Sequence, residues 1–60
     1  MKHISTEVSE KIKKFRKIKN ISQEELALRS VINLSTIKKY ECGLRNPKPE
    51  QLKKIATTLG

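Results

Sequence analysis

The chain has 60 residues, with 14 lysines and arginines against 6 aspartates and glutamates, a net charge of +8, and only two aromatic residues. This length leaves room for one small domain with a thin aliphatic core, which argues against a multi-domain enzyme with a large catalytic cleft. The excess of positive charge favours a polyanionic partner such as nucleic acid, and a solvated lysine-rich surface is the plain alternative.

The single cysteine cannot form a disulfide within the chain, which fits a reducing compartment, and we expect a cytoplasmic location. The sequence contains no apolar run near the length that a membrane span or a signal peptide needs, so no membrane contact is expected.

A first amphipathic helix is predicted within residues 3–19. Its apolar residues recur at helical spacing on one face: Val8, Ile12 and Phe15. Ser5 or Thr6 is expected to cap its start, and Asn20 to end it, because asparagine tolerates the left-handed conformation. A basic helix of this kind can also lie on a membrane, but that needs a broader apolar face.

A second helix is predicted from a capping box that runs from Ser22 to Glu25. The Ser22 hydroxyl is expected to accept from the amide of Glu25, while the Glu25 carboxylate reaches back to the amide of Ser22. The helix is expected to run to about Ser30, with Leu26 and Ala27 on its inner side.

A third helix is predicted after Asn33, which is a good capping residue, with Ile32 and Ile37 spaced for a hydrophobic staple. Gly43 stands where a left-handed residue ends a helix. The inner face is expected to comprise Ile37, Tyr40, Glu41 and Leu44. The outer face is expected to comprise Ser35, Lys38, Lys39 and Cys42.

A fourth helix is predicted after a basic loop, with Pro49 at its first position and Gly60 at its end. Its inner stripe is expected to comprise Leu52, Ile55, Ala56 and Leu59.

The arrangement of the middle elements indicates function. Two short helices, 23–30 and 34–42, joined by three residues, form a helix-turn-helix unit, in which the second helix enters the DNA major groove. The sequence shows no nucleophile–base pair, no carboxylate pair on one face and no phosphate loop, so we expect no enzyme activity and no cofactor. No neighbouring Cys or His suggests a metal site beside Cys42.

From about Val8 to Gly60, the chain resembles the lambda-repressor-like, Cro/repressor (XRE) type of helix-turn-helix domain. The segments that carry the resemblance are Ile12-Lys-Lys-Phe-Arg16, Ile21-Ser-Gln-Glu-Glu-Leu-Ala27, Ser35-Thr-Ile37, Tyr40-Glu-Cys-Gly43, Pro47, Leu52-Lys-Lys-Ile-Ala56 and Leu59-Gly60. The resemblance implies an all-α, four-helix bundle, truncated from five helices, forming a single domain over residues 1–60 with the helix-turn-helix unit at about 22–42.

The resemblance also implies a prokaryotic or phage-type transcriptional regulator, a repressor, that binds a pseudo-palindromic double-stranded DNA operator. The family commonly continues into a fifth helix used for dimerisation, so this chain is either an excised domain or a short member. A homodimer is expected to be weakened or absent without that helix.

The resemblance assigns roles to individual positions. Gln23 would bind a phosphate and support the third helix, and Arg16 with Glu41 would form a partly buried ion pair. The positions that face bases or the nearby backbone would be Asn33, Leu34, Ser35 and Lys39, with Lys38 on the same outer face. The phosphate-side positions after the helix would be Cys42, Arg45, Asn46 and Lys48.

Plainer roles stay open for several of these residues. Lys39 could be a solvated lysine, Gln23 could help to cap its helix, and Glu41 could be a solvated acid. Leu34 could contact a thymine methyl group or merely be exposed. Cys42 could be a passive small residue or a redox switch.

Val31 departs from the family pattern, which usually has glycine at this turn. A β-branched residue is costly at positive φ, so we expect either a reshaped turn or strain of about 1–3 kcal/mol. With Leu28 it would form an exposed apolar patch, which favours an alternative function as an interaction module of the antitoxin or coactivator-adaptor type. Binding of single-stranded RNA is disfavoured because Tyr40 and Phe15 are expected to point inward.

Overall fold

The computed structural model describes residues 7–60, which form four helices and no strand. They are α1 (Glu7–Ile18), α2 (Gln23–Ser30), α3 (Leu34–Cys42) and α4 (Pro49–Leu59). The all-helical fold predicted from the sequence is therefore confirmed, including the bounds of the second and third helices. The predicted cap at Ser5 or Thr6 lies outside the described residues.

The two central helices begin at side-chain caps. The Ser22 Oγ accepts a hydrogen bond from the Glu25 backbone N at 3.0 Å, and the Asn33 Oδ1 accepts one from the Ser35 N at 2.8 Å. The reciprocal bond of the predicted capping box is not found among the hydrogen bonds of residues 7–60, and the Glu25 carboxylate accepts instead from Arg29 Nε at 2.6 Å on the next turn. Each cap satisfies a backbone donor that the first turn of a helix leaves free.

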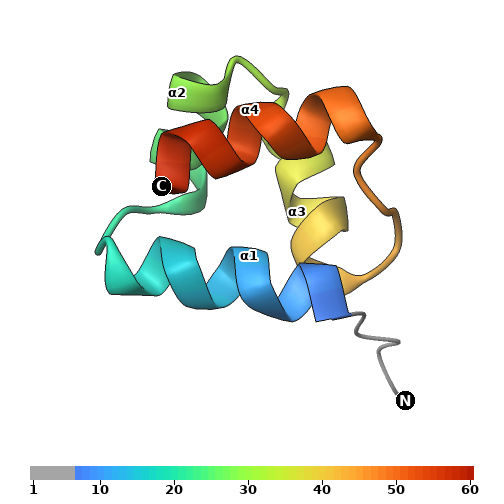
Figure 1. Cartoon of the computed structure of the whole chain (residues 1–60), viewed down its shortest axis with the longest axis horizontal. Helices are drawn as coiled ribbons and strands as arrows, with labels where there is room; N and C mark the ends of the chain where they lie inside the picture. Colours follow the sequence, from blue (N-terminus) through green and yellow to red (C-terminus); the bar gives the residue numbers. More distant parts are fainter. Residues whose placement is uncertain (1–6) are drawn as a thin grey trace.

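The four helices enclose one small core. In Figure 1, α1 and α4 face one another and run in the same direction along the long axis, and α3 lies behind the space between them. Helix α3 packs against α1 and α2, and α4 packs against α2 and α1. The buried apolar side chains are Ile12, Leu26, Ala27, Ile32, Ile37, Tyr40, Ile55 and Leu59.

Four side chains predicted to face the core are exposed instead. Leu44 is 78% exposed because the left-handed Gly43, at φ 84°, turns the chain away from α3 before Leu44 is reached. Phe15 and Leu52 are 47% and 38% exposed, and Ala56 is also exposed. The inward stripes predicted for α1 and α4 are therefore too broad: α1 buries Ile12 of its stripe, and α4 buries Ile55 and Leu59 of its own.

Left-handed residues end the first three helices. Asn20 has φ 60° and Gly43 has φ 84°, as expected of Asn and Gly at these positions. Val31 also lies in this region, at φ 57° and ψ 44°, and its amide bonds back to the end of α2. The turn between α2 and α3 thus keeps the left-handed geometry although its residue is β-branched.

Candidate nucleic-acid interface

Helix α3 presents a polar, cationic face to solvent. Ser35, Lys38 and Lys39 are exposed, whereas Ile37 and Tyr40 on the opposite side are buried. This separation follows from the helical period, since residues three or four apart share a face. The core therefore holds α3 by its apolar side and leaves its cationic side free to meet a polyanion.

The N-terminal end of α3 offers a smaller polar surface than the sequence suggests. Asn33 is exposed, but its Oδ1 caps the helix, so a contact with DNA would use its amide nitrogen. Leu34 is half-buried and packs against the core cluster, which leaves only part of this side chain for a thymine methyl group.

The loop after α3 adds further donors. Arg45, Asn46 and Lys48 are all exposed, directly beyond the C-terminal end of the helix. Cys42 is half-buried, and its Sγ donates to the Lys39 carbonyl at 3.5 Å, so the thiol lies against its own helix. The cationic surface thus continues from α3 into this loop.

A buried polar cluster joins α1, α2 and α3 behind this surface. Arg16 donates to Glu41 through Nε at 2.6 Å and Nη2 at 3.2 Å, and through Nη1 to the Ile21 carbonyl at 2.8 Å. Gln23, the first residue of α2, donates through Nε2 to Glu41 Oε1 at 3.1 Å. Glu41 is 3% exposed, so burial of its charge depends on these donors.

The bond between Gln23 and Glu41 is the feature of the site that sequence reasoning missed. The two residues are 18 positions apart in the chain, on different helices, and no spacing rule joins them. The family resemblance implied that Gln23 supports the third helix, but it did not identify Glu41 as the residue that Gln23 contacts.

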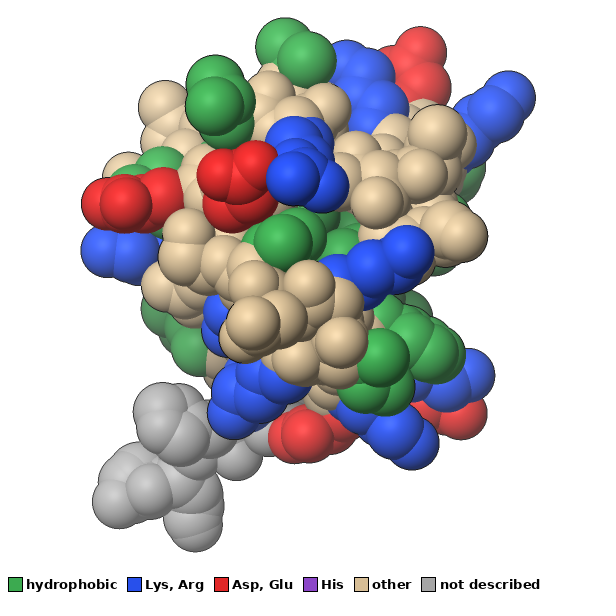
Figure 2. All heavy atoms as spheres, turned by 90° about the vertical axis from the view of Figure 1, so that its left-hand side faces the viewer, with side chains coloured by type: hydrophobic (Ala, Val, Ile, Leu, Met, Phe, Trp, Pro, Cys, Tyr) green, Lys and Arg blue, Asp and Glu red, His purple; other side chains and the backbone are tan. Residues whose placement is uncertain are grey.

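One face of the protein carries basic, acidic and hydrophobic side chains together. Figure 2 shows the side that lies to the left in Figure 1, where basic, acidic and hydrophobic side chains are interspersed. Leu28 and Val31, on α2 and its following turn, are 76% and 80% exposed. This face is therefore not uniformly cationic, although the chain has a net charge of +8.

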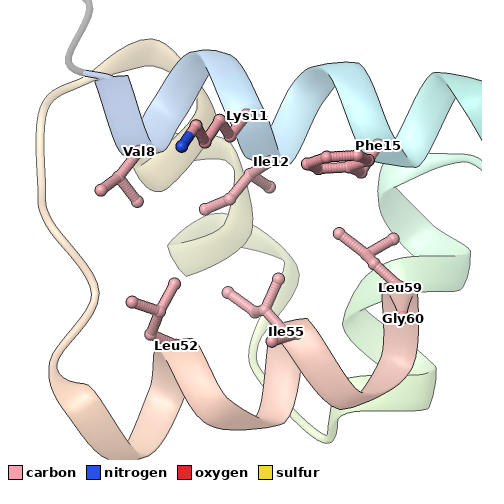
Figure 3. Close-up of a pocket in the computed structure, with 9 residues that line it drawn as sticks. Val8, Lys11, Ile12, Phe15, Leu52, Ile55, Leu59 and Gly60 are labelled. Carbon is pink, nitrogen blue, oxygen red and sulfur yellow. The ribbon is translucent and has the colours of Figure 1, made fainter.

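A hollow lies between α1 and α4, with a volume of about 670 Å³. Figure 3 shows Val8, Ile12 and Phe15 from α1 facing Leu52, Ile55 and Leu59 from α4 across it. Within residues 7–60, Lys11 is the one charged residue that lines it, and it pairs with the exposed Glu7 at 3.8 Å. Among the described residues, the lining of this hollow is apolar apart from Lys11, so the hollow is an apolar groove.

Two other kinds of site can be assessed over residues 7–60. This part of the chain contains no group of three or more His, Cys, Asp or Glu side chains that could hold a metal ion. None of its helices combines the length and the apolar character needed to cross a bilayer.

Comparisons with known proteins agree with this geometry. A family model described as helix-turn-helix matches residues 12–60, which include α2, α3, α4 and most of α1. The chain matches no curated protein and no solved structure.

Proposed function

This chain belongs to the helix-turn-helix family of lambda-repressor-like, DNA-binding regulators, and we propose that it is a sequence-specific repressor that places α3 in the DNA major groove. The observation that carries this proposal is the exposure of Ser35, Lys38 and Lys39 on a helix whose other side is held in the core. The major groove of B-DNA is about 12 Å wide and admits one α-helix.

Base recognition is assigned to the outer face of α3. The Lys39 ammonium can donate to O6 and N7 of guanine, which discriminates against a wrong base by about 1–3 kcal/mol. The Ser35 hydroxyl can donate or accept, and it lies in the first turn of α3, the end that enters the groove. Asn33, Leu34 and Lys38 complete this group as contacts to bases or to the adjacent backbone.

Phosphate contacts are assigned to residues on both sides of α3. Gln23 lies at the start of α2, where the helix dipole also favours an anion, and the exposed loop supplies Arg45 and Lys48. Asn46 and Cys42 lie beside them as lesser contacts. With about four phosphates neutralised, the logarithm of the DNA-binding constant is expected to fall with log[salt] at a slope of about −3.6 per monomer.

In-vitro selection of bound DNA from a random pool tests the proposal, and two variants separate its parts. Lys39→Ala should relax the base preference at one position of the selected site. Lys48→Ala should weaken binding to all sequences alike and flatten the salt slope by about 1 unit. A uniform loss of affinity in both variants would contradict the base-reading role of Lys39.

The selected site also reports how many copies bind. A pseudo-palindrome with half-sites about 34–36 Å apart would indicate a homodimer on the operator. A single half-site would indicate that one copy binds alone.

A second candidate function, an adaptor or antitoxin-like interaction module, is favoured by the exposure of Leu28 and Val31. Large side chains exposed next to one another suit a protein interface. A gel shift at physiological salt discriminates, because an adaptor should show no preference for a selected site over random DNA.

A further inference from the structure

We propose that Glu41 is a positioning residue for DNA, which holds the amide of Gln23 so that its nitrogen donates to a backbone phosphate. The inference rests on the proposed function, because it requires that the domain binds DNA. The ion pair of Arg16 with Glu41 would then contribute to DNA binding as well as join α1 to α3.

The geometry of the cluster carries the first step. Gln23 Nε2 lies 3.1 Å from Glu41 Oε1, the same oxygen that accepts from Arg16 Nη2 at 3.2 Å. Glu41 is nearly fully buried and is held by Arg16 Nε at 2.6 Å on its other oxygen. The carboxylate is therefore fixed on α3, and the Gln23 side chain reaches it from α2.

The chemistry of the amide carries the second step. A glutamine side chain has one end that donates two hydrogen bonds and one end that only accepts. An ionised carboxylate only accepts, so Glu41 attracts the nitrogen of Gln23 and repels its oxygen. One N–H is used by Glu41, and the second N–H of the same nitrogen can donate to a phosphate, which also only accepts.

Charge balance carries the third step. An unpaired carboxylate behind Gln23 would repel an approaching phosphate, since like charges in a region of low dielectric interact strongly. Arg16 lies against Glu41 with two hydrogen bonds, so the pair is close to neutral as a unit. Glu41 can thus orient Gln23 without opposing the anion that Gln23 is to bind.

Holding the Gln23 side chain in place before DNA binds should raise the affinity, because less conformational entropy is then lost on binding. A free glutamine side chain loses rotamer freedom when it binds a ligand, and a side chain that is already held loses less. Without Glu41 to hold it, Gln23 would make the same phosphate contact, but the contact would contribute less to the affinity for DNA.

The first experiment measures the order of the amide in the free protein by ¹⁵N relaxation of side-chain NH₂ groups. Gln23 should show a rigid amide, while the exposed Asn46 serves as the mobile reference in the same spectrum. In Glu41→Gln, two amides face each other, and Gln23 should become mobile. A Gln23 amide as mobile as that of Asn46 in the unaltered protein would overturn the inference.

The second experiment measures how far the contact between Gln23 and one DNA phosphate depends on Glu41, on the selected DNA site. Each backbone position is replaced in turn by an uncharged methylphosphonate, and several replacements should weaken binding. At the phosphate that Gln23 contacts, the loss should be about tenfold, the range of a hydrogen bond to a charged group. That sensitivity should disappear in Gln23→Met and fall to about twofold in Glu41→Gln. Glu25→Gln, which breaks the exposed pair with Arg29, should retain the full tenfold sensitivity.

The outcomes separate the inference from the proposed function. DNA binding with undiminished phosphate sensitivity in Glu41→Gln would overturn the role of Glu41 and leave the proposed function intact. Failure to select any DNA would overturn both. If Glu41→Gln does not fold, Glu41→Asp keeps the charge that pairs with Arg16 but is one methylene shorter, and it should show the same loss of coupling.

Discussion

The two sides of α1 are joined to the rest of the molecule in different ways. On one side, Arg16 reaches Glu41 on α3, and Gln23 on α2 completes a buried polar cluster. On the other side, α1 faces α4 across an apolar groove in which Phe15 and Leu52 remain exposed. Directional bonds fix the helices behind the proposed DNA-binding surface, whereas the side chains that face one another across the groove between α1 and α4 are mostly apolar and make contacts that are not directional.

This difference indicates where a small domain concentrates its structural precision. A 60-residue chain buries a limited fraction of its surface and cannot enclose all its apolar side chains. Here the well-defined contacts hold α1, α2 and α3 together, and the part left open is the α1–α4 face. If the two sides also differ in their contributions to the free energy of unfolding, substitutions on the polar side and at the groove should have effects of different size.

The largest effect is expected from Glu41→Ala, which removes the acid from the polar cluster. The half-buried Arg16 would lose its ion pair, and the free energy of unfolding should fall by about 3–5 kcal/mol. Urea denaturation followed by circular dichroism measures the change.

The control for this variant removes both partners. In Arg16→Met combined with Glu41→Leu, no unpaired charge remains buried, so most of the lost stability should return. If the double variant were as unstable as Glu41→Ala alone, loss of packing rather than an unpaired charge would be the cause.

The next largest effect is expected at the groove, where two residues of α4 can be compared. Ile55 is 1% exposed and Leu52 is 38% exposed. Ile55→Ala should cost about 2–5 kcal/mol through a cavity in the core, whereas Leu52→Ala should cost about 1 kcal/mol. Thermal melting of the two variants checks this, and equal losses would mean that the groove is closed in solution.

The two regions also differ in how far the sequence predicts them. The helix-turn-helix unit was predictable because local signals mark it: Ser22 and Asn33 cap the two helices, and Gly43 ends the second. Its inner and outer faces follow from the helical period, and the buried Ile37 with the exposed Lys38 and Lys39 agree with it.

The groove and the polar cluster were harder to predict because both depend on how distant segments meet. Periodicity marks Phe15 and Leu52 as members of apolar stripes but does not say how closely α1 approaches α4. The bond between Gln23 and Glu41 likewise depends on the packing of α2 against α3, which no local pattern contains. Family resemblance pointed to the pair of Arg16 and Glu41 and to a supporting role for Gln23, but it did not predict that Gln23 bonds to Glu41.

Val31 tests the turn between the two helices that the polar cluster holds. Its φ of 57° places a β-branched side chain in the left-handed region, where glycine is favoured, and the side chain is 80% exposed. Val31→Gly should therefore raise the free energy of unfolding by about 1 kcal/mol, since relief of strain exceeds the greater entropy of glycine in the unfolded chain. Unchanged or lower stability in thermal melting would show that Val31 is not strained.

The smallest effect is expected from Glu25→Gln, which provides the exposed counterpart of the buried pair. Glu25 and Arg29 form an ion pair at 2.6 Å one turn apart on α2, with side chains 40% and 55% exposed. Exposed pairs of this spacing contribute only about 0.3–0.5 kcal/mol, because water screens the charges and two long side chains must be ordered. The loss should vanish in about 1 M salt, where the Debye length is about 3 Å, whereas the loss in Glu41→Ala should persist because burial limits screening. Urea denaturation at low and high salt measures the loss of unfolding free energy in both variants. If the loss in Glu25→Gln were as large as that in Glu41→Ala and equally resistant to salt, burial would not distinguish the two pairs.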